Sequence, residues 1–490
     1  MREPVGSPPR SGSVLACVCA CTALVVGLVA AINLAVPMVA ASGLRPSGAQ
    51  LLWIVDAYIV VFACLVIPGG AAGDRFGRKG ALLAGLLTFA AGAAVSALAP
   101  NVVLLLAGRA ITGVGAALVL PNALGVLVHA TAPEGRGRAL AVWAAMTGIG
   151  GLLGNVGGAT VLSAGSWRGL FAAIVPIALG CALWVGLVAP RSARHYRRLD
   201  PVGTVLFVAA TVALLVGIIE GPERGWGSGV VLGAFACCGV LGALWVAVEI
   251  RSPAPLLDPR LFRIPLLASA CLGMLVTFFG SFGLFYLNAS LLQYGRGYPV
   301  LLTGLGVLPL SLPLLAGSRY VPGLVRRIGV PATLGAAFLA TGLGLFGLST
   351  AARQPYPAYA AWLVVIGIGI TLALPCLTAE LTAALPVERA GVAGGLQSAT
   401  RELGSALGVA VVGTVLTATF TRRLPMISGH TPRTVAQALT VAPDRGAAIV
   451  DAFTDGAVSA LRVAALVTVT AGAVVVAVVV RKDPSARGPR

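Results

Sequence analysis

GAAGDRFGRKGAL, residues 70–82, lies between two apolar runs that are each long enough to cross a membrane. Four charged side chains stand in six positions of this stretch, among glycines. Glycine allows the backbone to turn tightly and charged groups avoid hydrocarbon, so the pattern predicts a short charged hairpin at one face of a bilayer. Its polar and glycine positions are Gly70, Asp74, Arg75, Gly77, Arg78 and Lys79.

The composition also indicates an integral membrane protein. Of the 490 residues, 58% are hydrophobic and 10% are charged, whereas soluble domains carry about 25% charged residues. A span needs about 20 apolar residues. The sequence predicts an all-α membrane protein with fourteen transmembrane helices, over residues 13–40, 50–71, 81–99, 102–129, 138–163, 167–189, 202–221, 229–250, 264–292, 300–323, 329–349, 358–384, 391–418 and 459–480.

The basic residues are sorted by loop. The net charge is +18, and 22 of the 34 Lys and Arg residues fall in the two tails and in alternate loops, while nine fall in the opposite loops. This is the positive-inside bias. It predicts cytoplasmic tails in an inner (plasma) membrane and argues against nucleic acid as a partner. Arginine outnumbers lysine 32 to 2, which fits a bacterial genome of high GC content.

Two halves of the chain repeat each other. GVGAALVLP at residues 113–121 matches GIGITLALP at residues 367–375, and at the same offset Gly150 and Gly154 match Gly404 and Gly408. We therefore expect two six-helix bundles related by a parallel repeat, with substrate bound between them. The seventh and eighth spans are an inserted central pair.

The repeat predicts the domain organisation. The expected parts are an N-tail (1–12), an N-terminal bundle (13–189), a linker with the inserted helices (190–263), a C-terminal bundle (264–480) with an outer loop (420–458), and a C-tail (481–490).

The loop at residues 70–82 resembles the signature G-x-x-x-D-R-x-G-R-[KR] of the major facilitator superfamily. Fourteen spans in this order are similar to its drug:proton antiporter subfamily. The resemblance implies a monomeric exporter of hydrophobic or cationic drugs, driven by the proton gradient without a cofactor or ATP. It also implies that this cytoplasmic loop, with Asp74 and its cations, acts as a gate by clamping the two halves in the outward-open state. A plain positive-inside anchor is the alternative.

Two polar residues inside the spans are candidates for proton coupling. WIVDAY, residues 53–58, closely resembles a W-[IV]-V-D-x-Y segment of the subfamily, and Arg109 opens a segment that resembles R-x-x-x-G-x-G, associated there with proton transfer. Helical rise places Asp56 roughly 10 Å and Arg109 about 12 Å from the outer surface. We expect Asp56, Arg109 and Asn33 to share one polar layer, with Asp56 carrying the proton. A structural aspartate, or a structural salt bridge of Arg109, is the alternative.

The chain departs from the family pattern at three places. In the first span Leu28 and Ala30 replace the usual aspartate and threonine. In the antiporter glycine motif of the fifth span Asn155 replaces a proline among Gly150, Gly154 and Gly158. In the thirteenth span Glu402 follows Arg401. Glu402 is either a relocated proton or cation site or a partner for Arg401.

Five residues are candidates for lining the cavity, namely Asn33, Trp53, Tyr58, Gln293 and Arg401. Glu249, near the end of a span, is expected to be solvated or interfacial. Cys17, Cys19 and Cys21 are expected to be packing residues, and no metal site is predicted.

Other classes of function fit the sequence less well. The three histidines are scattered and no catalytic motif or phosphate loop is present in the sequence, so an enzyme is not expected. A narrow-specificity transporter of a secondary metabolite or nutrient, or a non-transporting membrane sensor on the same fold, remains as an alternative.

Overall fold

The computed structural model describes residues 11–132, 135–190, 200–252, 255, 257–385, 390–424, 432 and 434–482. The described part is helical and contains no strand. Thirteen of its helices are long and apolar enough to cross a membrane, and a shorter apolar stretch lies at Ile149–Ser163. The predicted fold class is thereby confirmed, with helices in the order expected of fourteen spans.

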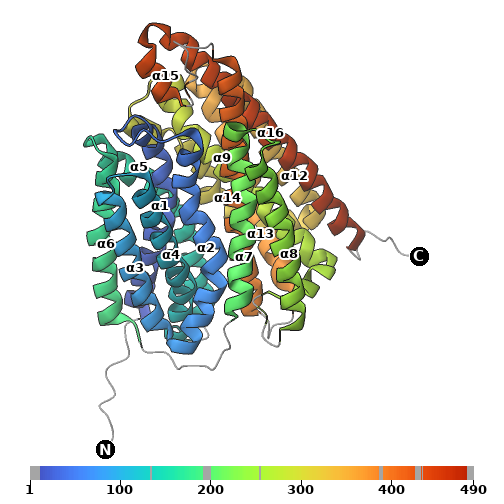
Figure 1. Cartoon of the computed structure of the whole chain (residues 1–490). Coiled ribbons are helices and arrows are strands. Elements are labelled where there is room, and N and C mark those ends of the chain that lie inside the picture. The colour runs from blue at the N-terminus through green and yellow to red at the C-terminus, as the bar shows by residue number, and fades with distance from the viewer. Residues whose placement is uncertain are drawn as a thin grey trace, which may run out of the picture.

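The first six helices form the N-terminal half (Figure 1). In it α1 packs on α5 and α6, α3 packs on α4 and α6, and α2 packs on α4. Several helices begin after a residue whose side chain caps the first turn. Ser47 caps α2 and Asn101 caps α4. The helices are α1 (Ser11–Ala40), α2 (Gly48–Phe76), α3 (Arg78–Leu98), α4 (Val102–Ala130), α5 (Arg136–Ser163) and α6 (Trp167–Val188).

The C-terminal half follows the inserted helices α7 (Pro201–Arg224) and α8 (Gly229–Arg251). Its tenth span is divided into short helices, and Gly329, with φ 81°, turns the chain inside α12 into the eleventh span. Its elements are η2 (Pro259–Arg263), α9 (Pro265–Ser290), a π-helical turn η3 (Leu291–Gly295), α10 (Val300–Leu305), α11 (Leu308–Gly317), η4 (Ser318–Tyr320), α12 (Val321–Ala351), α13 (Tyr356–Ala383), α14 (Ala390–Arg423), α15 (Val435–Val441), η6 (Pro443–Arg445) and α16 (Gly446–Lys482).

Matching glycines make matching contacts in the two halves. A Cβ on Gly113 would meet the α2 backbone and one on Gly367 would meet the α11 backbone, so the second and fourth spans of each half touch there. Gly154 is pressed against α1 and Gly408 against α9, which are the first spans of the two halves. The sequence repeat is therefore a repeat of helix packing, because only glycine allows these backbones to approach so closely.

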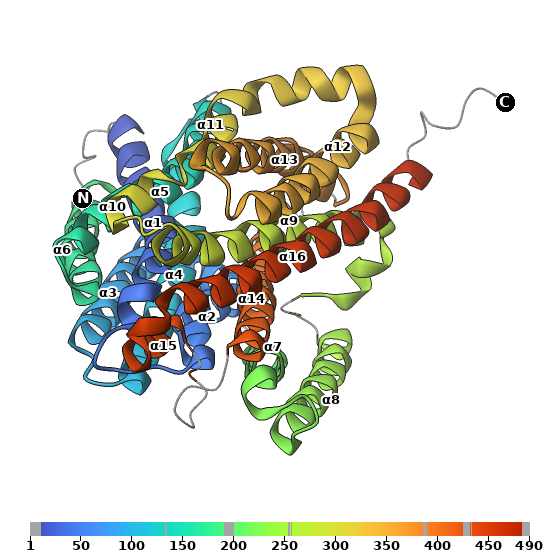
Figure 2. The same cartoon turned by 90° about the horizontal axis from the view of Figure 1, so that it is seen from above.

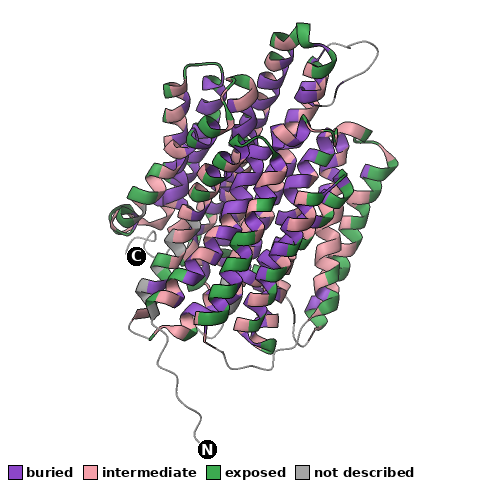
Figure 3. Cartoon of the chain, turned by 90° about the vertical axis from the view of Figure 1, so that its left-hand side faces the viewer, coloured by how far each residue is buried: buried purple, intermediate pink, exposed green. Residues whose placement is uncertain are grey.

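The two halves meet along a two-fold seam. On one side α2 packs on α14, and on the other α5 packs on α10 and α11, so the second span of each half meets the fifth span of the other. The inserted helix α7 contacts α2 and α14, and α8 packs mainly on α7 (Figure 2). Buried positions concentrate inside the assembly, and exposed positions lie on its outer faces and ends (Figure 3).

Two details differ from expectation. The segment predicted as an outer loop, residues 420–458, is helical over much of its length, because α14 continues to Arg423 and α16 already begins at Gly446. Glu249 is buried rather than solvated, with 1% of its surface exposed, and its carboxylate accepts a hydrogen bond from the Leu257 N–H at 3.4 Å. Leu257 therefore lies against the end of α8, which a span prediction does not reveal.

Candidate functional site

A cavity of about 170 Å³ lies at the centre of the seam. Helices α1, α2 and α5 of the N-terminal half and α9, α11, α13 and α14 of the C-terminal half form its wall. The wall is mostly apolar, and three phenylalanines of α9 cover one side, Phe278, Phe282 and Phe285, with neighbouring ring centroids 6.0 and 5.7 Å apart. Pockets that hold drug-sized ligands measure roughly 300–1,000 Å³, so this cavity is smaller than such a pocket.

An ion pair on α14 supplies the charge of this cavity. Arg401 Nε and Nη2 each lie 2.7 Å from Glu402 Oε1, and both residues line the wall. The arginine also lies over the Phe278 ring, 5.6 Å from its centroid. Ala30, at the position where the family usually has threonine, faces the same cavity. Leu28, at the position of the family's aspartate, is buried in the core and does not line this cavity, whereas Glu402 of α14 does.

A second polar centre is buried inside the N-terminal half. Asp56 and Arg109 both have 0% of their surface exposed. Arg109 does not pair directly with the carboxylate: its Nε donates to the Ile54 carbonyl at 2.8 Å and its Nη2 to the Val55 carbonyl at 3.3 Å. Neither oxygen of Asp56 has a hydrogen-bond partner among the described residues. Burial without partners strongly disfavours a charged carboxylate.

Tyr58 lies between the two polar centres. Its ring stacks under the Arg109 guanidinium, 4.8 Å from Cζ, and its hydroxyl donates to the Val25 carbonyl of α1 at 3.3 Å. It interacts electrostatically with Arg401 and Glu402 as well as with Arg109. Asp56 itself does not appear on the cavity wall. Asp56 would therefore not contact a substrate in this cavity directly.

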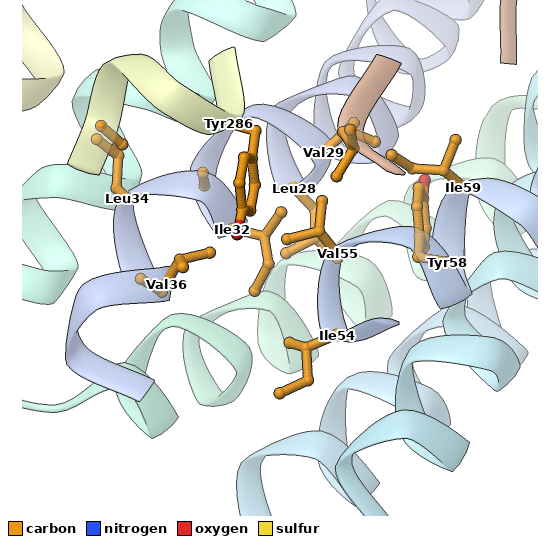
Figure 4. Packing of buried hydrophobic residues seen from close by; sticks show 14 of the residues in the cluster. Leu28, Val29, Ile32, Leu34, Val36, Ile54, Val55, Tyr58, Ile59 and Tyr286 are labelled. Atoms are coloured by element: carbon orange, nitrogen blue, oxygen red, sulfur yellow. The ribbon is translucent and has the colours of Figure 1, made fainter. Parts of the chain in front are cut away.

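Tyr286, which no sequence pattern marks, reaches this region from the other half. It belongs to α9 and lies beside Ile32 of α1 (Figure 4). It also interacts electrostatically with Asp56. No motif marks Tyr286, because its role depends on where α9 crosses α1. The surroundings of Asp56 thus include a side chain of the C-terminal half.

The other cavity candidates lie elsewhere. Asn33 is buried and its Nδ2 donates to the Val29 carbonyl of its own helix at 3.1 Å. Trp53 packs partly buried against the core of the bundle. Gln293 Nε2 donates to the Leu34 carbonyl at 3.1 Å, which ties η3 of one half to α1 of the other. Of the five candidates, the structure places Arg401 on the cavity wall.

The glycine motif of α5 forms the contact between α5 and α1. A Cβ on Gly150 would lie 2.9 Å from the Ala23 Cα, and one on Gly154 or Gly158 would also strike α1. Asn155 faces the cavity, and its Nδ2 donates to the Gly151 carbonyl at 3.1 Å. Asparagine keeps the backbone N–H that proline lacks, and α5 runs as one helix through this position.

The charged loop between α2 and α3 turns at Gly77, with φ 101°. Asp74 and Arg78 form an ion pair, with Nη2 and Oδ1 2.9 Å apart. Lys79 Nζ donates to the Gly186 and Ala189 carbonyls at the end of α6, at 2.8 and 2.7 Å. A cation at a helix C-terminus is favoured by the helix dipole. These contacts hold the loop against its own half.

Comparisons with known proteins agree with this fold. The sequence profile of the Major Facilitator Superfamily matches residues 18–409. The chain is 34% identical over 371 residues to the multidrug resistance protein Stp of Mycobacterium tuberculosis, covering 75% of this chain and 69% of Stp. It is 30% identical to the multidrug efflux pump LfrA of Mycolicibacterium smegmatis (90% and 91% covered) and 35% identical to the cephamycin export protein CmcT of Amycolatopsis lactamdurans (83% and 85%).

Solved structures show the same architecture. A bacterial homolog of the human lysosomal transporter Spinster superposes with a TM-score of 0.72 at 16% identity, covering 99% of both chains. The POT family transporter PepTSo superposes with a TM-score of 0.66 at 14% identity, covering 98% of this chain and 100% of that one. With the profile match, the relatives and this architecture together, the chain belongs to the major facilitator superfamily.

Proposed function

We propose that the chain exports hydrophobic compounds, including lipophilic cations, from a bacterial cell in exchange for protons. The observation that carries the proposal is the central cavity, which both halves enclose and whose apolar, aromatic wall holds one ion pair, Arg401 with Glu402. An aromatic wall accommodates many apolar molecules, and a carboxylate beside it attracts cations. The resistance and export functions named for the relatives support the same direction of transport.

We assign the proton to Asp56 and the cationic substrate to Glu402. Asp56 is buried away from the cavity and without hydrogen-bond partners among the described residues, which suits a protonated carboxyl. Glu402 already pairs with a cation, the Arg401 guanidinium. A cationic substrate can take the place of that guanidinium beside the carboxylate. Because Tyr286 belongs to the opposite half, rocking of the halves removes it from Asp56 and changes access to that carboxyl. Arg109 then stabilises the deprotonated form.

Proton flux in inverted membrane vesicles tests this function. With the cytoplasmic face outward and the interior acidified, addition of a cationic dye or a neutral antibiotic is expected to release protons only from vesicles that contain the chain. Vesicles lacking the chain are the control. If none of a broad set of compounds evokes release, the export proposal is wrong, and a narrow-specificity transporter or a sensor takes its place.

Glu402→Gln is expected to reduce transport of cationic dyes about 10- to 100-fold, the value of a hydrogen-bonded charge in a shielded site, and to leave neutral antibiotics nearly unaffected. Glutamine keeps an acceptor for Arg401. Concentration-dependent dye efflux from whole cells measures the change. Glu220→Gln is the matched control, because Glu220 pairs with Arg224 on the inserted helix α7 and away from the cavity. Equal losses for charged and neutral substrates would instead make Glu402 a proton carrier or a structural partner.

Asp74→Asn is expected to abolish export while leaving the amount of protein in the membrane unchanged. The substitution removes the charge that pairs with Arg78, and we propose that this loop controls how the halves close on the cytoplasmic side. Its structural cost is small, because partly exposed ion pairs contribute only about 0–1 kcal/mol. Immunoblots of membranes alongside drug-resistance assays separate the two effects, and full resistance in this variant would remove the gating role.

A further inference from the structure

A second cavity, of about 530 Å³, lies outside the central seam. It occupies the space between α13 and the chain that runs from α11 through η4 into the start of α12. Figure 2 shows this part of α12 arching away from α13, on the side opposite α7 and α8. The two segments pack closely at Gly367, where a Cβ would strike the Leu310 carbonyl, and are still in contact at Gly317, where a Cβ would lie 3.2 Å from Thr371 Cγ2. Beyond that point they diverge until Gly329 reverses the chain.

The cavity has an apolar wall and a basic rim. Ile368 and Leu372 of α13 face Val321 and Leu324 of α12. Two consecutive arginines, Arg326 and Arg327, complete the lining. The guanidinium of Arg326 bends back toward the cavity, because its Nη2 lies 3.9 Å from a Cβ built on Gly323, itself a lining residue.

The two arginines are available to a ligand. Both are exposed, and within the part of the chain that the structure describes neither forms an ion pair with an acid. Arginine binds phosphate in a bidentate manner and is less strongly hydrated than lysine. Two such side chains on one rim form a favourable binding site for a phosphate group.

The depth of the cavity matches one leaflet of the bilayer. Leu372 is sixteen residues along α13 from Tyr356, which corresponds to about 24 Å at the helical rise. The apolar wall therefore lies at the acyl-chain level of the leaflet opposite the outer end of α13. Arg326 and Arg327 belong to the loops that the positive-inside bias places in the cytoplasm. The basic rim is thus at the level of the cytoplasmic headgroups.

We propose that this cavity binds a phospholipid of the cytoplasmic leaflet that has an anionic headgroup. The phosphate lies on Arg326 and Arg327, and an acyl chain lies along Ile368 and Leu372. Basic pockets between helices on the cytoplasmic side suit such lipids. The same two helices, α11 and α13, also form part of the central cavity wall through Leu314 and Ile370. A bound lipid therefore holds the spacing of two helices that line the transport path, and the site does not depend on which substrate is carried.

Lipid binding to the purified full chain in a neutral detergent tests the proposal. Phosphatidylglycerol is expected to raise the melting temperature of the wild type, whereas phosphatidylcholine and inorganic phosphate at equal concentration are not. The double variant Arg326→Gln/Arg327→Gln is expected to bind phosphatidylglycerol about thirtyfold more weakly, from the contribution of two arginines near a membrane surface. Native mass spectrometry gives an independent measure of retained lipid.

Two further variants locate the lipid. Arg251→Gln/Arg263→Gln removes the same charge from the end of α8 and from η2, outside the cavity, and is expected to keep wild-type affinity. Ile368→Trp places a bulkier side chain on the apolar wall with both arginines intact and is expected to weaken lipid binding. Equal weakening by the control variant, unchanged binding in Ile368→Trp, or stabilisation by phosphate alone or by phosphatidylcholine would each overturn the proposal.

Discussion

Asp56→Asn is expected to abolish substrate-evoked proton flux, so that vesicles containing the variant give the same signal as vesicles without the protein. Asparagine has nearly the same size as aspartate but cannot bind and release a proton. The site is completely buried, next to a guanidinium that is occupied by the Ile54 and Val55 carbonyls. Loss of the titrating group therefore removes the coupling step without creating a cavity in the core.

The same variant is expected to retain substrate exchange. Vesicles loaded with unlabelled substrate should still take up labelled substrate, because the central cavity and Glu402 are unaltered. Glu402→Gln gives the opposite pattern, with proton coupling kept for neutral substrates. Proton-coupled export that survives in Asp56→Asn would move the proton to another group, with Glu402 as the first candidate to test.

Gly154→Val is expected to destabilise the protein by at least about 1–3 kcal/mol, the usual cost of forcing extra atoms into a packed core, and to eliminate export. Any Cβ at this position strikes the backbone of Gly27, so α1 and α5 must separate. Thermal unfolding of the purified protein and drug resistance of cells that express it measure the two effects.

Gly157→Val is the matched control for this prediction. Gly157 lies on the same helix three residues later, and a Cβ there meets nothing within 4 Å. Its stability and activity should remain close to those of the wild type. Gly408→Val should reproduce the defect of Gly154→Val, because Gly408 makes the equivalent contact with Phe279 of α9. Equal stability of the Gly154→Val and Gly157→Val variants would contradict the close packing of α1 and α5.

The number and order of the helices could be read from the sequence. Apolar runs of about 20 residues leave few alternatives in a bilayer, because every backbone polar group must be satisfied inside its own segment. The repeat of Gly113 at Gly367 and of Gly154 at Gly408 also predicted two similar halves, since close helix packing constrains residue size at regular positions. Helix ends in polar segments were less predictable, as the start of α16 at Gly446 shows.

The residues of the site could be predicted only in part from the sequence. Three ionisable residues inside the spans, Asp56, Arg109 and Glu402, were predicted to be functional, because ionisable groups are costly in hydrocarbon. The sequence could not reveal that Glu402 faces the cavity while Asp56 does not, or that Tyr286 lies close to Asp56.

The sequence by itself determined that this is a membrane protein of two repeated helical halves with a few charged residues at mid-membrane depth. Only the tertiary structure decided which of those residues share a cavity. The reason is physical: hydrophobicity and local spacing are properties of one segment, whereas a binding site depends on the rotation and crossing of helices far apart in the chain. Those are set by contacts such as Gly154 on Gly27, which appear only when the whole bundle is assembled.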